Sequence, residues 1–164
     1  MESELSTMPF APVWDEACRV LVLGSHPSVL SKQNGFYYMN PHNRFWPMLS
    51  ALLGADLVSA DAEAKRRVLL AHHIALYDVV ASCAIVGSQD ATIRGVRPAD
   101  LVPLVEGAPI DAVYLNGKTA YSLFCRHFPQ YVDRARCLPS TSPANARMRL
   151  PDLIRAWAVL KEHL

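Results

Sequence analysis

The stretch that decides the fold is Arg19–Gly24, with the sequence RVLVLG. Its central residues are apolar on both faces of an extended chain, which is typical of a strand covered by helices above and below. Three similar runs end at turn-forming residues, namely Ile74–Val80 (IALYDVV), Ile110–Asn116 (IDAVYLN) and Arg136–Pro139 (RCLP). We therefore expect four strands that belong to one sheet.

Helical patterns fill the intervals between these strands. They cover Arg44–Leu53, Asp61–His72, Pro98–Val105, Lys118–Phe128 and Pro151–Leu164. Alternating strands and helices predict an α/β fold whose central parallel sheet has helices on both faces. Because ligands bind such sheets at the carboxyl ends of the strands, motifs that directly follow the strands should converge on one edge.

The composition is that of one compact domain, which we expect to cover residues 1–164. Of these residues 51% are hydrophobic and 19% are charged, which argues against disorder. The net charge of +1 gives no sign of a nucleic-acid partner. The arginines of the C-terminal part nevertheless form a local basic stripe that can bind phosphate, with a solvated face as the alternative. They are Arg134, Arg136, Arg147, Arg149 and Arg155.

The four cysteines, Cys18, Cys83, Cys125 and Cys137, are widely spaced and contain no Cys-x-x-Cys pair. This spacing disfavours a zinc or iron–sulfur site and fits reduced thiols in a cytosolic protein. The N-terminal residues lack the apolar core of a signal peptide, and no stretch approaches the ~18 apolar residues of a membrane span. We expect a cytoplasmic protein with no metal, no cofactor and no membrane partner.

The first motif, Gly24-Ser25-His26-Pro27-Ser28, ends the first strand in a tight turn. Glycine lets the backbone approach a ligand, and the hydroxyls and exposed N–H groups can hold a base edge or a phosphate. Such a turn occurs in many α/β proteins. The following stretch, Gly35–Trp46 (GFYYMNPHNRFW), is more specific. Its aromatic residues can pack in the core. Those in the loop before the helix can instead stack on a nucleobase, which stabilises the complex by ~1–3 kcal/mol per base.

A strand that ends in G-x-x-P and leads to N-P-x-N-R-F-W resembles the uracil-DNA glycosylase superfamily, in particular its mismatch-specific uracil glycosylases and hypoxanthine-DNA glycosylases. The resemblance extends from residue 19 to about residue 150. It implies a three-layer α/β/α sandwich with a four-stranded, mainly parallel central sheet.

The same resemblance assigns roles to residues of the first motif and the aromatic loop. It places Tyr38 where the family stacks a ring on the flipped base, beside Gly24 and Ser25, and places Asn43 at the asparagine of the motif. His26 stands where uracil-removing members usually have Asp or Asn to orient the attacking water. This departure favours the hypoxanthine branch, with Asn43 as the main catalytic residue and His26 in support.

The second motif begins at Asp78 and continues into GSQDATI at positions 87–93. Its pattern D-V-x-x-S-C followed by G-S-x-D-x-x-I resembles the hypoxanthine enzymes. Asp78 can accept a hydrogen bond from N1–H of hypoxanthine, while Asn43 or a backbone N–H donates to O6. Ser88, like Ser28, is expected to contact DNA phosphate. Taken singly, Asp78 and Ser88 also fit a turn cap and an ordinary loop residue.

The third motif, LPSTSPANAR at 138–147, follows the last strand. It resembles the loop that enters the minor groove in uracil glycosylases, with Leu138 in place of their His or Asn. We expect Ser140 and Ser142 to bond to phosphates, Thr141 to Pro143 to form a wedge and Arg147 to neutralise backbone charge. Asn145 is a further expected DNA-binding residue.

Together these features imply a monofunctional DNA glycosylase that flips out and hydrolyses a deaminated purine, hypoxanthine before others, and that acts as a monomer on DNA with a damaged or mismatched base. Two alternatives stay open. One is a G:U or G:T mismatch-specific uracil or thymine glycosylase. The other is a non-catalytic α/β nucleotide-binding protein or an esterase-like protein, although the sequence lacks G-x-S-x-G, a P-loop and G-x-G-x-x-G.

Overall fold

The computed structural model describes residues 4–7, 10–85 and 94–164. Its centre is a four-stranded sheet of order β3–β2–β6–β7, in which each neighbouring pair is parallel. The strands are β2 (Val20–Gly24), β3 (Ile74–Asp78), β6 (Ala112–Asn116) and β7 (Ala135–Leu138). All five residues of β2 are buried, as their two-sided apolar pattern requires. The predicted four-stranded parallel sheet is confirmed.

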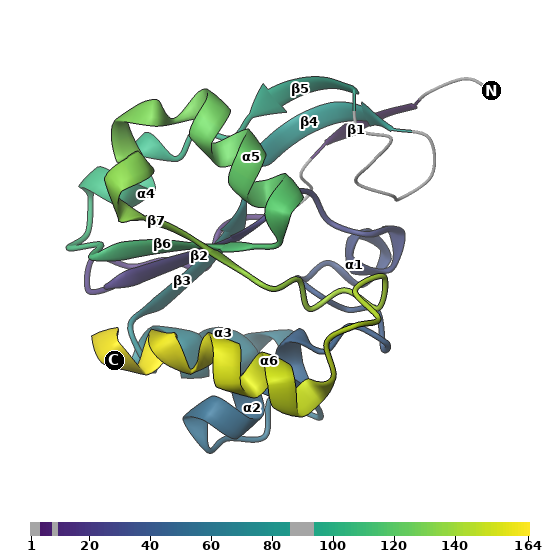
Figure 1. Ribbon diagram of the computed structural model, residues 1–164, viewed down its shortest axis with the longest axis vertical. Coiled ribbons are helices and arrows are strands. Elements are labelled where there is room, and N and C mark those ends of the chain that lie inside the picture. Colours follow the sequence, from purple (N-terminus) through teal and green to yellow (C-terminus); the bar gives the residue numbers. More distant parts are fainter. Residues whose placement is uncertain (1–3, 8–9, 86–93) are drawn as a thin grey trace.

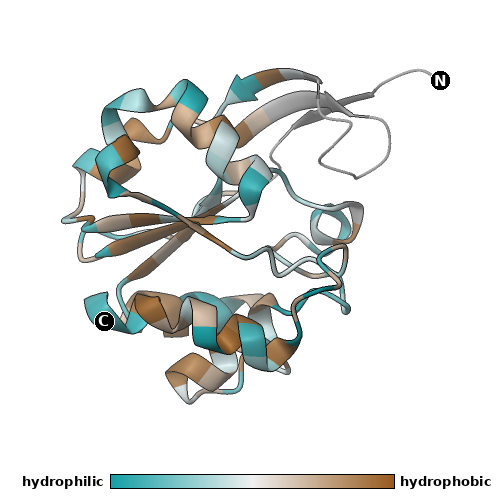
Figure 2. Ribbon diagram, in the orientation of Figure 1, coloured by the Kyte–Doolittle hydropathy of each residue, from teal (hydrophilic) through white to brown (hydrophobic). Residues whose placement is uncertain are grey.

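Helices cover both faces of this sheet (Figure 1). On one face lie α2 (Phe45–Leu53), α3 (Ala62–Ala71) and α6 (Leu150–Trp157); on the other lie α4 (Val102–Glu106) and α5 (Lys118–His127). Alternate residues of β2 face opposite ways, so that Val20 and Val22 belong to one core and Leu21 and Leu23 to the other. The apolar colouring of the strands between two amphipathic layers is visible in Figure 2. The three-layer sandwich is therefore confirmed.

A second, antiparallel sheet was not expected from the sequence. It has the order β1–β4–β5 and contains β1 (Glu4–Thr7), β4 (Val80–Ile85) and β5 (Arg94–Pro98). The predicted strand Ile74–Val80 divides because β3 ends at Asp78, and the N–H groups of Val79 and Val80 then donate to the carbonyls of Gly24 and Ser25. The chain thereby leaves the central sheet and enters the second one.

Two predictions of helices need correction. Pro98 ends strand β5 instead of opening a helix, and α4 starts only at Val102. The predicted helix Pro151–Leu164 divides into α6 and a 3₁₀ helix, η3 (Ala158–His163). Two further elements were not predicted, α1 (Val29–Asn34), which Ser28 caps through its side chain, and the 3₁₀ helix η2 (Pro129–Arg134). Within the described residues, no helix combines the length and apolarity that crossing a membrane requires.

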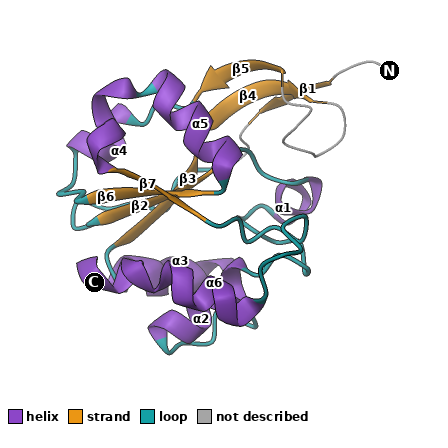
Figure 3. Cartoon of the chain, viewed as in Figure 1, coloured by secondary structure: helices purple, strands orange, loops and turns teal. Residues whose placement is uncertain are grey.

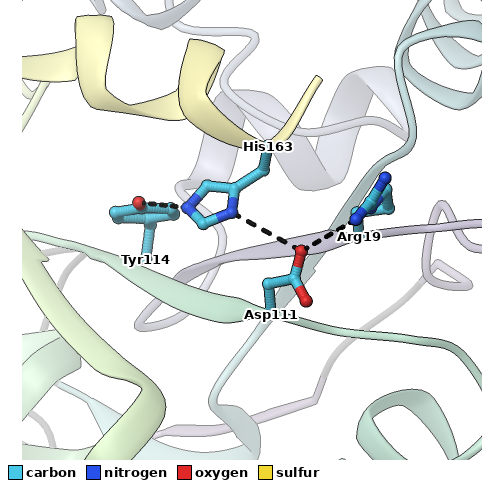
Figure 4. Close-up of polar contacts among 4 residues, drawn as sticks. All are labelled: Arg19, Asp111, Tyr114 and His163. Carbon is cyan, nitrogen blue, oxygen red and sulfur yellow. Dashed lines mark hydrogen bonds and ion pairs between the residues drawn. The ribbon is translucent and has the colours of Figure 1, made fainter.

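The two ends of the sheet differ in character. At the amino ends of β2 and β6, a small polar cluster holds η3 against the sheet (Figure 4). The hydroxyl of Tyr114 lies 2.9 Å from Nε2 of His163, and Asp111 lies 3.7 Å from the other nitrogen of that ring and 3.4 Å from Arg19. The loops around α1 and the loop between β7 and α6 lie together at the opposite end (Figure 3).

Replacing Tyr114 with Phe tests the contribution of the Tyr114–His163 contact. The variant keeps the buried ring and loses the hydroxyl, so we expect the free energy of unfolding to fall by about 1 kcal/mol. Urea denaturation measures this change. The matched control is Arg155→Ala, which removes an exposed ion pair with Asp152 and should change the midpoint much less. Equal midpoints for Tyr114→Phe and the wild type would contradict a stabilising role for the contact.

Candidate active site

A pocket of about 610 Å³ opens at the carboxyl ends of the central strands. Its volume lies within the range of small-ligand sites, and its position is the one expected for a parallel sheet. The lining residues expected from the sequence are Gly24, Ser25, His26, Ser28, Tyr38, Asn43, Asp78, Ser140, Thr141, Ser142 and Asn145. Of the remaining expected residues, Ser88 lies outside the described part of the chain, and Arg147 is exposed and does not line the pocket. The first and third motifs therefore converge with Asp78 of the second, whose positions 87–93 lie outside the described residues.

Gly24 allows two functional groups to meet beneath the pocket. A Cβ atom at this position would lie 2.6 Å from Oδ1 of Asp78 and 2.9 Å from the hydroxyl of Tyr38. Any side chain would therefore displace the carboxylate or the phenol. Gly24 and Asp78 are direct partners in the β2–β3 register, and Asp78 is only 4% exposed. The glycine of the first motif is required by this close approach.

The two adjacent tyrosines have different environments. Tyr37 is buried, its hydroxyl donates to the carbonyl of Ala11 at 2.8 Å, and burial raises the pKa of its phenol. Tyr38 has a φ of 55°, in the left-handed region that non-glycine residues seldom adopt, and it lines the pocket. Its ring stacks on Phe45 with a centroid distance of 4.1 Å. Tyr37 is therefore a core residue that borders the pocket, whereas Tyr38 is the less buried of the two lining tyrosines.

The ring of His26 is held in one tautomer. Its Nδ1 lies 3.3 Å from the carbonyl oxygen of Val80, which can only accept a hydrogen bond. Nδ1 therefore carries the proton, and Nε2 of the neutral ring carries the lone pair. Burial lowers the pKa of His26 to about 4, and the positive charge of Lys32 adds to this effect, while the contact with Val80 opposes it. His26 is neutral at pH 7.

Asn43 presents a single kind of group to the pocket. Its side-chain oxygen accepts from the N–H of Phe45 at 2.9 Å and from the hydroxyl of Thr141 at 2.8 Å. Since a backbone N–H can only donate, the atom facing Phe45 must be the oxygen of the amide. Within the described residues, no acceptor engages the nitrogen of this amide. Asn43 thus offers its NH₂ group to a ligand.

The structure corrects the expectation for Thr141. Its side chain is completely buried, so it does not take part in a DNA-facing wedge. The exposed tip of this loop consists of Pro143 and Ala144 instead. The hydroxyls of Ser140 and Ser142 accept from N–H groups of the same loop at 3.1 and 3.2 Å and shape its turn.

Sequence reasoning missed Arg44 and Asn116. The guanidinium of Arg44 donates to the carbonyls of Met148, of Ser142 at 2.7 Å and of Asn145 at 3.0 Å. Asn116, at the end of β6, bonds to Thr141 through both atoms of its amide. The only available signal was that Arg44 lies inside the N-R-F-W motif. In the described part of the chain, no cluster of His, Cys, Asp or Glu side chains could hold a metal ion.

The chain is similar in sequence to known proteins. The family model of the uracil DNA glycosylase superfamily matches residues 11–161. A hypoxanthine DNA glycosylase of Methanosarcina acetivorans is 34% identical over 141 residues, which cover 84% of this chain and 87% of that protein. One of Methanosarcina barkeri is 34% identical over 110 residues, which cover 66% and 70%.

A solved structure agrees with the sequence matches. It is the solution NMR structure of a candidate uracil DNA glycosylase from Methanosarcina acetivorans, with a TM-score of 0.75 and 29% identity. The superposition covers 96% of this chain and 99% of that one. Fold, pocket and sequence lead to one conclusion: the chain belongs to the uracil DNA glycosylase superfamily.

Proposed function

We propose that this protein is a monofunctional DNA glycosylase that removes hypoxanthine from deoxyinosine in DNA. The proposal rests on one observation. The buried carboxylate of Asp78 and the NH₂ donor of Asn43 both line one pocket at the carboxyl ends of the strands. The name of the two Methanosarcina relatives supports the same base.

The donor and acceptor pattern of the pocket suits hypoxanthine and opposes adenine. Hypoxanthine carries an N1–H donor next to its O6 acceptor, whereas adenine has an acceptor at N1 and a donor at N6. The carboxylate of Asp78 accepts from N1–H of hypoxanthine but faces the lone pair of N1 in adenine. Uracil also has an N–H between two carbonyls, so Asp78 does not exclude it. His26 stands where uracil-removing members usually have Asp or Asn, and this departure favours hypoxanthine over uracil.

The reaction is hydrolysis of the bond between C1′ of the sugar and N9 of the base. The electron pair of that bond leaves with the base, which takes up a proton, while the oxygen of water bonds to C1′ and releases a proton. Positive charge develops on the sugar and negative charge on the base. Asn43 donates to the base as its charge grows, and Nε2 of His26 accepts from water. Lysine is absent from the described pocket lining, which accounts for a glycosylase without lyase chemistry.

DNA contacts surround the mouth of the pocket. Extrusion of the base costs a few kcal/mol and is easiest for a weak pair such as that of inosine. Stacking on Tyr38 and the hydroxyls of Ser28, Ser140 and Ser142 offset this cost, while Pro143 and Ala144 occupy the gap. We assign a flanking phosphate contact to Arg147. The protein acts as a monomer in the cytoplasm in this proposal.

Excision assays test the proposal directly. Oligonucleotides that contain inosine, uracil, xanthine or a G:T mismatch are incubated with the protein, and abasic sites are cleaved with alkali. We expect inosine to be the best substrate and Asn43→Ala to lower its single-turnover rate by ~10²–10³ because one transition-state donor is lost. Preference for G:U over inosine would replace hypoxanthine with uracil as the substrate. A wild-type rate for Asn43→Ala would remove Asn43 from the mechanism.

Asp78→Asn tests the recognition of N1–H. The amide of Asn can turn its NH₂ towards N1 of adenine. We therefore expect the ratio of the excision rates of hypoxanthine and adenine to fall by about tenfold or more, because the one hydrogen bond that distinguishes N1 of the two bases is lost. The ratio of hypoxanthine to uracil should change much less, since both bases offer an N–H. Competition between inosine, adenine and uracil oligonucleotides measures both ratios. Unchanged selectivity among the three would remove Asp78 from base recognition.

The pH profile tests the state of His26. Because the pKa of His26 is lowered from 6.5 to about 4, the ring stays neutral as the pH falls from 8 to 5. We expect the single-turnover rate to show no His26-dependent step near pH 6.5. The profiles of wild type and His26→Gln, each divided by its value at pH 8, should therefore run parallel over this range. A step at pH 6.5 that is lost in His26→Gln would mean that the ring titrates as an exposed histidine.

A further inference from the structure

We propose that Asn116 and Thr141 form a hydrogen-bond relay that fixes the amide of Asn43 as a donor toward the bound base, so that both act as positioning residues of the reaction. The inference rests on the proposed function of Asn43. It adds two residues that never touch the reacting atoms in the mechanism above. The relay joins the end of β6, the loop after β7 and the loop before α2.

The first link sets the orientation of Asn116. The backbone N–H of Thr141 donates to Oδ1 of Asn116 at 3.0 Å. Because this N–H can only donate, the oxygen of Asn116 must face it, and the nitrogen must face the other way. That nitrogen lies 3.0 Å from Oγ1 of Thr141 and donates to it. Asn116 therefore binds Thr141 in one orientation of its amide.

The second link follows from the single proton of the Thr141 hydroxyl. Oγ1 already accepts from Asn116, and its proton is directed to Oδ1 of Asn43 at 2.8 Å. The N–H of Phe45 donates to the same oxygen at 2.9 Å. With both lone pairs of Oδ1 occupied, a flip of the Asn43 amide would bring its NH₂ against the N–H of Phe45 and would remove the acceptor of the Thr141 proton. The direction of every bond in the chain is thus determined.

The burial of Thr141 raises the free-energy cost of reversing these hydrogen bonds. Thr141 has no exposed surface, so water cannot replace a lost partner. Hydrogen bonds in series also polarise one another, and two donors on the oxygen of Asn43 make its N–H groups stronger donors. That strength matters most when negative charge builds on the leaving purine. The same arrangement prevents Oδ1 of Asn43 from accepting a hydrogen bond from the attacking water, which leaves that task to Nε2 of His26.

A double-mutant cycle tests the relay. Thr141→Val removes the hydroxyl at nearly constant shape, and Thr141→Ser keeps it. We expect Thr141→Val to lower the single-turnover excision rate by roughly 10- to 100-fold with little change in the Kd for inosine DNA, and Thr141→Ser to recover most of the rate. In the Asn43→Ala background, Thr141→Val should cost less than about twofold, because its effect passes through Asn43.

The outcomes separate this inference from the proposed function. A wild-type rate for Asn43→Ala overturns the role of Asn43 itself. A slow Asn43→Ala enzyme combined with a wild-type rate for Thr141→Val, or with an equal loss from Thr141→Val in both backgrounds, overturns the relay alone. Far-ultraviolet circular dichroism and melting temperature establish folding of each variant.

Asn116→Asp provides a second route if Thr141→Val does not fold. Aspartate still accepts from the N–H of Thr141 but cannot donate to its hydroxyl, which then turns to the carboxylate and leaves Asn43. We expect Asn116→Asp to lower the excision rate about as much as Thr141→Val does. In the Asn43→Ala background, Asn116→Asp should leave the excision rate nearly unchanged. A wild-type rate for Asn116→Asp would overturn the relay.

Discussion

The pocket depends on the way Arg44 joins two distant loops. Its side chain donates to three carbonyls of the loop after β7, and its backbone N–H donates to the carbonyl of Thr141 at 3.0 Å. Within the described residues, no carboxylate forms an ion pair with this half-buried guanidinium, whose partners are the three carbonyls. Since Asn43 precedes Arg44 directly, one peptide unit ties the amide that we propose to be catalytic to the loop between β7 and α6. The spacing between them is thereby fixed.

The parallel sheet supplies the second constraint. In the register of β2 and β3, Gly24 lies opposite Asp78, and in the register of β6 and β7, Asn116 lies opposite Leu138. The loops that follow these strands therefore start side by side at one edge of the sheet. At this edge Gly24 leaves room for a carboxylate and a phenol together. The phenol of Tyr38 reaches this position from a strained backbone. The left-handed φ of Tyr38 turns its ring away from the core position of Tyr37.

The sequence predicts the parts of this molecule whose environment is local. Strand β2 is recognisable because its residues are apolar on both faces, and the convergence of the motifs follows from strand polarity alone. Strand β5 is not recognisable, because Arg94–Pro98 contains arginine, glycine and proline and becomes a strand only by pairing with β4. Thr141 lies in a polar loop, which suggests exposure, but it is buried and bonds to Asn116, which is distant in the sequence at the end of β6.

In the function that we propose, selectivity follows from groups whose direction is fixed before a base arrives. Phe45 and Thr141 hold the amide of Asn43 as a donor, and a low pKa with the carbonyl of Val80 holds His26 neutral in one tautomer. Adenine is far more abundant in DNA than hypoxanthine, so its rejection matters more than tight binding. A group that cannot reorient rejects adenine by leaving buried donors or acceptors unpaired, at about 1–3 kcal/mol each. In the function that we propose, the rigidity of these side chains is therefore itself the means of discrimination.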